Sequence, residues 1–148
     1  MDPRDNLLVD DARVRDLVRS SKRIAVLGMK TERHEDRPAF YVPAALKEWG
    51  AEIVPVPVYF PEVTRILGEK VYRKLADVPG PIDIVDVFRR PRDIPAHVED
   101  MKAAKTRAVW FQLGIRNDDA ALELARAGIL VVQDRCLMVD WRRFAKAT

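Results

Sequence analysis

The sequence predicts a doubly wound α/β domain, in which helices cover both faces of a parallel sheet of five strands. Short apolar runs alternate with segments of helical periodicity through most of the chain, and a length of 148 residues suits one domain, spanning 1–148, with a full core. The five expected strands are residues 23–29, 51–58, 82–88, 108–112 and 129–133. We expect the strand order 3-2-1-4-5, numbered along the chain, which would bring all five carboxyl ends toward one crevice.

The first helix and the first strand are clear in the sequence. Asp10 or Asp11 can cap the helix, and its apolar residues at helical spacing are Val14, Leu17 and Val18. The serines at 20–21 end it. The strand at 23–29 is a continuous apolar run with β-branched residues, and Gly28 stops it.

Prolines complicate the next helix and strand. An apolar stripe predicts a second helix and consists of Val42, Leu46 and Trp49. Pro43 is comfortable only in a first turn, so we expect this helix to begin near Tyr41 or Val42 and to end before Gly50. Two prolines weaken the far end of the strand at 51–58, because each removes a hydrogen-bond donor.

The second half of the chain returns to regular alternation. Residues 59–81 give little pattern beyond one possible helical turn at 62–67. Asn117 can cap a helix that Gly128 ends. The helices expected in this half are residues 93–104, 118–127 and 139–145.

The composition argues against several classes of protein. The net charge of +3 comes from 26 basic and 23 acidic residues spread along the chain, an excess too small to indicate a nucleic-acid partner. We expect no membrane span, because 18 apolar residues never run together, and residues 1–11 do not resemble a signal peptide. The single cysteine, Cys136, excludes an intramolecular disulfide and favours the reducing cytoplasm.

The loop after the first strand has the features of a phosphate-binding turn. Gly28 allows a tight turn, and the amides of residues 29–31 would then point outward. Basic residues of this loop would stand beside the N-terminus of the second helix, namely Lys30, Arg33 and Arg37. Two more follow the third strand at the same edge of the sheet, Arg89 and Arg90. The alternative is a solvated loop, because the charges of residues 30–37 nearly cancel.

Other chemistry finds less support. A dinucleotide fingerprint is not expected, because Gly28 stands alone and no acid ends the second strand. No metal site is expected, because His34 and His97 belong to different elements. Cys136 follows a strand end beside Arg135, but a reactive thiol needs a base or a positive neighbourhood, and a packed cysteine is the alternative. We therefore assign no catalytic residue.

Three segments resemble a known family. They read VDVFRRPRDIPAHVED, VWFQLGIRNDDAALELARAGILVVQDRC and ILGEKVYRKLADVPGPIDIVD. They are similar to the small stand-alone CoA-binding proteins of bacteria and archaea, which in turn resemble the CoA-binding domain of the succinyl-CoA synthetase α subunit. The resemblance covers about residues 10–143. It implies a Rossmann-like fold with coenzyme A (CoA) or an acyl-CoA bound in the crevice.

The resemblance also implies which loops hold CoA. The loop after the first strand would cradle the pyrophosphate, the loop after the second strand would contact the nucleotide end, and the loop after the fourth strand would complete the site. Together with the basic residues above, the candidate CoA-binding residues are Gly28, Met29, Lys30, Thr31, Arg33, Arg37, Pro57, Tyr59, Arg89, Arg90, Phe111, Gln112 and Leu113.

Two of these loops depart from the family pattern. The first is longer and more charged, and Tyr59 takes the place where the synthetases have a CoA-contacting lysine. The synthetase reaction uses a phosphorylated histidine on another domain, so the resemblance does not carry that reaction over. We expect a carrier, sensor or accessory module whose partner is the small molecule CoA. The alternatives are a CoA-linked transferase using Cys136, another nucleotide-dependent enzyme, or an interaction protein with a vestigial nucleotide site.

Overall fold

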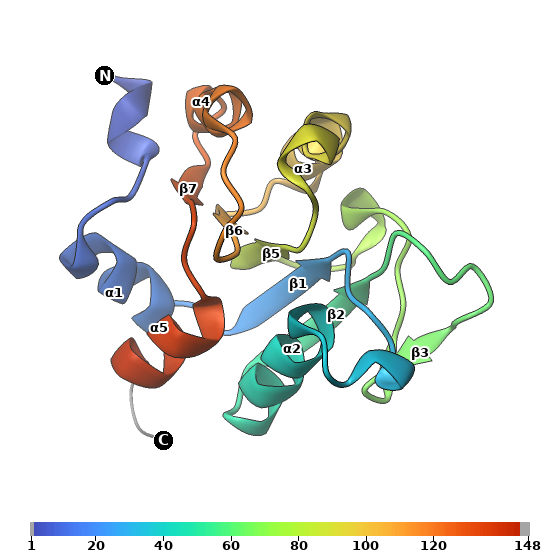
Figure 1. The fold of residues 1–148 in the computed structure, drawn as a ribbon. Helices are drawn as coiled ribbons and strands as arrows, with labels where there is room; N and C mark the ends of the chain where they lie inside the picture. Colours follow the sequence, from blue (N-terminus) through green and yellow to red (C-terminus); the bar gives the residue numbers. More distant parts are fainter. Residues whose placement is uncertain (1, 146–148) are drawn as a thin grey trace.

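The computed structural model describes residues 2–145 and confirms a doubly wound α/β architecture (Figure 1). Each strand of the parallel sheet lies within an expected range, because apolar β-branched runs suit strands that are buried on both faces. These strands are β1 (Arg23–Leu27), β2 (Glu52–Val56), β5 (Ile84–Val87), β6 (Ala108–Phe111) and β7 (Leu130–Val132).

The strand order within this sheet corrects the expected one. The order is β2-β1-β5-β6-β7, so the third parallel strand along the chain pairs with the first and not with the second. Pro55 in β2 gives the physical reason. It has no N–H to offer a further strand, and its carbonyl accepts a hydrogen bond from the Tyr72 N–H at 3.0 Å. β2 therefore lies at the sheet edge, and the strand order reverses between β1 and β5.

Helices cover both faces of the sheet, as Figure 1 shows. One face carries α1 (Asp11–Arg19), α2 (Pro38–Glu48) and α5 (Leu137–Phe144), and the other carries α3 (Val98–Ala104) and α4 (Asp118–Arg126). Short 3-10 helices occupy the connections η1 (Pro3–Asn6), η2 (Glu32–His34), η3 (Leu75–Asp77), η4 (Pro91–Asp93) and η5 (Pro95–His97). Among residues 2–145, no helix is long and apolar enough to cross a membrane.

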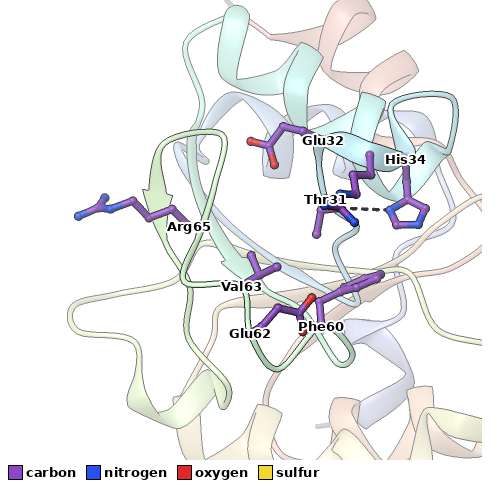
Figure 2. A pocket seen from close by; sticks show the side chains of 8 residues that line it. Thr31, Glu32, His34, Phe60, Glu62, Val63 and Arg65 are labelled. Carbon is purple, nitrogen blue, oxygen red and sulfur yellow. Dashed lines mark hydrogen bonds between the residues drawn. The ribbon is translucent and has the colours of Figure 1, made fainter.

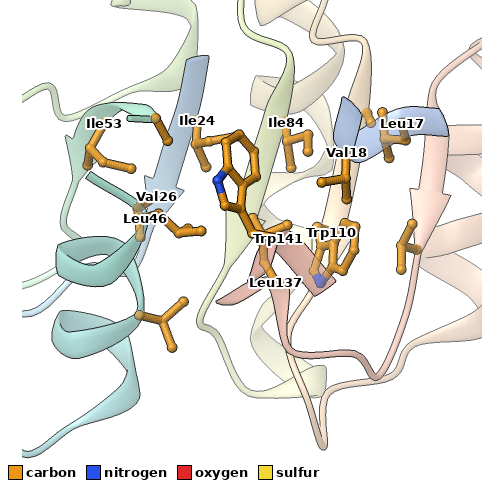
Figure 3. Close-up of a cluster of buried hydrophobic side chains, with 14 of the residues drawn as sticks. Leu17, Val18, Ile24, Val26, Leu46, Ile53, Ile84, Trp110, Leu137 and Trp141 are labelled. Carbon is orange, nitrogen blue, oxygen red and sulfur yellow. The ribbon is translucent and has the colours of Figure 1, made fainter. Parts of the chain in front are cut away.

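A layer of apolar side chains packs on each face of the sheet. Between the sheet and the helices α2 and α5, the side chains of Trp110 in β6 and Trp141 in α5 lie among those of leucine, isoleucine and valine residues (Figure 3). The indole N–H of Trp110 donates to the Arg135 carbonyl at 2.8 Å, so its polar atom is satisfied. Phe111 packs in the second cluster, beneath α3 and α4.

Helix α2 begins earlier than expected, at Pro38, and this places Pro43 inside the helix. Pro43 has no N–H to donate to the carbonyl of Ala39, four residues before it. That carbonyl instead accepts a hydrogen bond from the Lys30 N–H at 3.1 Å. The proline thus frees an acceptor that anchors the β1–α2 loop. It also means that the Lys30 amide points inward, contrary to the expectation for a phosphate-binding turn.

The segment between β2 and β5 contains a hairpin, so the expected helical turn at 62–67 is wrong. Strands β3 (Arg65–Ile66) and β4 (Glu69–Lys70) pair in antiparallel orientation. The two residues between them, Leu67 and Gly68, have φ of 53° and 75°. Two successive positive φ angles are typical of a type I′ turn, which suits a two-residue hairpin loop.

The helix ends agree with the expected capping residues. The Asp10 carboxylate accepts from the Arg13 N–H at 3.2 Å, and the Asn117 side chain accepts from the Ala120 N–H at 3.0 Å. The helix expected at 93–104 is replaced by η4, η5 and the shorter α3. The last helix begins at Leu137, two residues before its expected start.

Asp86 is a buried carboxyl in the middle of β5. Its neighbours across the sheet are Val26 and Trp110, which are fully buried, and neither of its oxygens has a hydrogen-bond partner in the described structure. Burial raises the pKa of Asp86 well above its ordinary value. Its pKa is therefore higher in the folded than in the unfolded chain, so its contribution to stability falls as the pH rises above about 3.9.

We expect Asp86→Leu, which keeps the side-chain shape, to raise the free energy of unfolding at pH 7 by about 1–3 kcal/mol, because an unsatisfied buried polar group is removed. Denaturant unfolding at pH 7 and pH 4 measures this, and the gain should be smaller at pH 4. Asp83→Leu is the matched control. Asp83 accepts from the N–H groups of Lys22 and Arg23 at 2.8 and 2.9 Å, so its loss should destabilise the fold. A destabilised Asp86→Leu variant would show that this carboxyl has a stabilising role.

Candidate functional site

A crevice of about 650 Å³ opens at the carboxyl ends of β1, β5 and β6, beside the point where the strand order reverses. Its walls come from the N-terminus of α2, the loops after β5 and β6, and the residue that precedes α5. The basic lining residues are Lys30, Arg37, Arg89 and Arg90. The apolar ones are Pro38, Ala39, Tyr41, Val42, Phe88, Pro91, Leu113 and Ile115, and the others are Gln112, Gly114 and Cys136.

The basic side chains of the crevice differ in how far they are neutralised. Arg90 Nε lies 2.9 Å from Asp93 Oδ2, and Arg89 Nη2 lies 3.8 Å from the same oxygen. The Arg90 guanidinium holds the pKa of Asp93 below its ordinary value. Lys30 and Arg37 form no ion pair with any carboxylate of residues 2–145. Their charges can therefore meet an anion next to the N-terminus of α2.

Arg89 crosses over Gly28 at the junction of β1 and β5. A Cβ built on Gly28 would lie 3.2 Å from Arg89 Cδ, and the guanidinium carbon stands 5.5 Å from the centre of the Tyr59 ring. Arg89 Nη1 is 3.5 Å from the Tyr59 hydroxyl, and this contact lowers the pKa of Tyr59. On its other side, Arg89 Nε donates to His97 Nε2 at 3.2 Å. Burial and the Arg89 charge lower the pKa of His97.

Gln112 and Cys136 border the crevice where β6 meets α5. The buried Gln112 accepts from the Leu137 N–H at 2.8 Å and so fixes the first turn of α5. Cys136 is the half-buried residue that precedes this helix. The neighbouring Arg135 does not supply a free charge, because two carboxylates bind its guanidinium, those of Asp140 and Asp11.

A second cavity, of about 670 Å³, lies between the β1–α2 loop and the loop after β2 (Figure 2). It is lined by Thr31, Glu32, Arg33, His34, Phe60, Glu62, Val63 and Arg65. The Thr31 hydroxyl and His34 Nδ1 are 3.2 Å apart, and the centres of the His34 and Phe60 rings are 5.2 Å apart. Within residues 2–145, no group of three His, Cys, Asp or Glu side chains suits a metal ion.

A family model described as a CoA binding domain matches residues 22–142, which include the whole parallel sheet and the crevice. The chain belongs to this CoA-binding domain family.

Relatives of this CoA-binding domain cover nearly its full length. The uncharacterized protein YneT of Bacillus subtilis (strain 168) is 35% identical over 128 residues, which are 86% of this chain and 91% of YneT. The solved structure of cell-free ID.343 from Thermus thermophilus is 38% identical, with a TM-score of 0.83, and the match covers 92% of this chain and 99% of that one. A hypothetical protein from Pyrococcus horikoshii OT3 is 29% identical, with a TM-score of 0.81 and coverage of 92% of both chains.

The structure of this CoA-binding domain separates the candidate residues into three groups. Those that line the crevice are Lys30, Arg37, Arg89, Arg90, Gln112 and Leu113. Thr31 and Arg33 line the second cavity instead. The remaining ones are not among the lining residues of these two cavities: Met29, Pro57 and Phe111 are buried, Gly28 is half-buried, and Tyr59 is exposed next to Arg89.

Several crevice residues were not predicted as site residues. Tyr41, Phe88 and Ile115 form much of its apolar wall. Tyr41 could have been found from its place in the first turn of α2, since that turn faces the strand ends. His97 does not line the crevice but contacts Arg89, and it had no such signal, because two short 3-10 helices bring it back to Arg89.

Proposed function

We propose that this domain binds CoA or an acyl-CoA in the crevice and acts as a carrier, sensor or accessory module. The observation that carries the proposal is the crevice itself, which combines four basic side chains with an apolar wall at the carboxyl ends of parallel strands. CoA has the matching chemistry, with phosphates at one end and a largely apolar pantetheine arm at the other. The membership of the chain in a CoA-binding family supports the same ligand.

The parts of CoA are assigned to parts of the crevice by their chemistry. Lys30 and Arg37 would meet the phosphates, because no carboxylate of residues 2–145 forms an ion pair with either side chain. The apolar wall, which includes Tyr41 and Leu113, would hold the pantetheine arm and any acyl group. The exposed ring of Tyr59, beside Arg89, would stack on the adenine, at the place where the succinyl-CoA synthetases that the family resembles have a CoA-contacting lysine. The single cysteine of the chain and the free thiol of CoA both suit the cytoplasm.

Calorimetric titration with CoA tests this assignment on variants of one loop. We expect Lys30→Ala with Arg37→Ala to weaken CoA binding at least tenfold, because each charge-assisted hydrogen bond contributes about 1.5–3 kcal/mol. Arg33→Ala is the matched control. It removes an arginine from the same loop, but this side chain lines the second cavity, so affinity should change less than threefold.

Two results would contradict the proposal. Equal losses of CoA affinity in the double variant and in Arg33→Ala would mean that the phosphates bind outside the crevice. No binding of CoA or acetyl-CoA to the unmodified protein at millimolar concentration would favour a vestigial site.

A further inference from the structure

Arg89 reaches the crevice from the centre of the sheet, where its position is closely confined. Its side chain is only 14% exposed, and it lies over Gly28 at the β1–β5 junction. The Tyr59 hydroxyl lies 3.5 Å from its Nη1, and Asp93 approaches its Nη2 at 3.8 Å. Neither contact has the distance of a strong hydrogen bond. The guanidinium thus depends on another group for its orientation.

His97 supplies that group. Arg89 Nε donates to His97 Nε2 across 3.2 Å. Because a guanidinium has only donors, the imidazole nitrogen that faces it must be the acceptor. His97 is therefore neutral in this arrangement, with its proton on Nδ1. A protonated imidazole would turn a donor toward Arg89 and place two positive charges side by side.

The surroundings of His97 favour the neutral ring. Burial lowers its pKa most, and the Arg89 charge lowers it further, while Asp100 and Asp93 act in the opposite direction. Asp100 is engaged elsewhere, since its oxygens accept from the N–H groups of Leu75 and Ala76 at 2.7 and 3.0 Å. Asp93 is bound to Arg90 at 2.9 Å. Both carboxylates thus have other partners, and His97 is left with Arg89.

We propose that His97 is a positioning residue, whose neutral imidazole holds Arg89 toward an anionic group of the ligand and releases it when the ring takes up a proton. The inference rests on the proposed CoA site. The affinity for CoA should therefore fall in acid through a residue that does not line the crevice. His97 acts only through Arg89, so it is not itself a ligand contact.

Calorimetric titrations with CoA between pH 7.5 and pH 5 on the unmodified protein, His97→Ala and His97→Gln test the proposal. His97→Ala should bind about tenfold more weakly than the unmodified protein at pH 7.5, because one charge-assisted contact is misplaced. Glutamine offers an amide oxygen to Arg89 and does not titrate. His97→Gln should therefore bind within about threefold of the unmodified protein at pH 7.5.

The pH profile separates positioning from a merely structural role. The phosphate monoester of CoA titrates near pH 6, so the change in affinity that its protonation causes is the same for the unmodified protein and all variants. As the pH falls from 7.5 to 5, the unmodified protein should lose more affinity than His97→Gln does, because only the imidazole can take up a proton and release Arg89. His34→Gln is the matched control, since this histidine lines the second cavity, and its profile should follow that of the unmodified protein.

Failure of the inference differs from failure of the proposed function. If the unmodified protein binds CoA but shares its pH profile with His97→Gln, His97 does not position Arg89. An affinity that rises in acid only when His97 is present would mean that the imidazolium itself attracts the ligand, which also overturns the proposal. If the unmodified protein does not bind CoA at all, both the proposed function and this inference fall together.

Discussion

Replacing Arg135 by methionine should lower the free energy of unfolding by about 3–5 kcal/mol, because it leaves a buried carboxylate without its partner. Asp140 in α5 is 4% exposed, and its two oxygens accept from Arg135 Nε at 2.7 Å and Nη2 at 3.1 Å. The carboxylates around Arg135 raise its pKa, so the guanidinium stays charged. This pair joins the chain after β7 to α5, which covers the Trp110 face of the sheet. Denaturant unfolding at pH 7 measures the loss.

Two further variants isolate the buried carboxylate. Arg143→Met removes the neighbouring arginine that binds Asp11 at 2.9 Å on the surface, and it should cost less than about 1 kcal/mol. Arg135→Met combined with Asp140→Leu removes both charges and should recover most of the stability that the single change loses. A loss below 1 kcal/mol for Arg135→Met alone would show that solvent reaches Asp140 and replaces its partner.

The sequence located all five strands of the parallel sheet but not their order. Buried strands appear as short apolar runs whatever their neighbours are, so alternation of strands and helices permits both 3-2-1-4-5 and 2-1-3-4-5. Pro55 carried the missing information, because a proline in the middle of a strand favours the sheet edge. The hairpin between β2 and β5 was missed for a related reason. Two-residue strands have no periodicity, and only the Leu67–Gly68 turn distinguishes them from a loop.

The sequence predicted well which residues line the crevice where they follow a strand directly. It predicted them less well where they lie inside loops. Arg89 and Gln112 stand at strand ends, so the parallel sheet alone places them at the crevice. Lys30 and Arg33 lie three residues apart in one loop, but Arg33 belongs to η2, which turns the chain, and the two residues line different cavities. His97 depends on the path of η4 and η5 through a proline-containing segment, which no spacing rule describes.

Gly28→Ala should lower the free energy of unfolding by about 2–4 kcal/mol and also weaken CoA binding. Gly28 has φ of +85°, and an added Cβ would lie 2.4 Å from the Phe88 carbonyl oxygen. Neither backbone can move aside easily. The Gly28 N–H donates to the Val56 carbonyl and the Phe88 N–H donates to the Leu27 carbonyl, both at 2.9 Å. The positive φ costs about 1 kcal/mol for alanine, and forcing an atom into a packed junction costs a further 1–3 kcal/mol.

Gly128→Ala separates the two contributions to this loss. Gly128 has φ of +84°, but its added Cβ would meet nothing within 4 Å, so only the conformational cost of about 1 kcal/mol applies. Denaturant unfolding measures the loss of unfolding free energy in both variants. The difference between the two losses is the cost of the clash. The relief of that clash must displace Phe88 or Arg89 from the strand end, so CoA affinity should fall at least tenfold in Gly28→Ala and stay unchanged in Gly128→Ala. If the two variants are equally stable and bind CoA equally well, β1 and β5 do not approach each other at Gly28 as closely as the structure shows, and the close junction that holds Arg89 over the crevice does not exist.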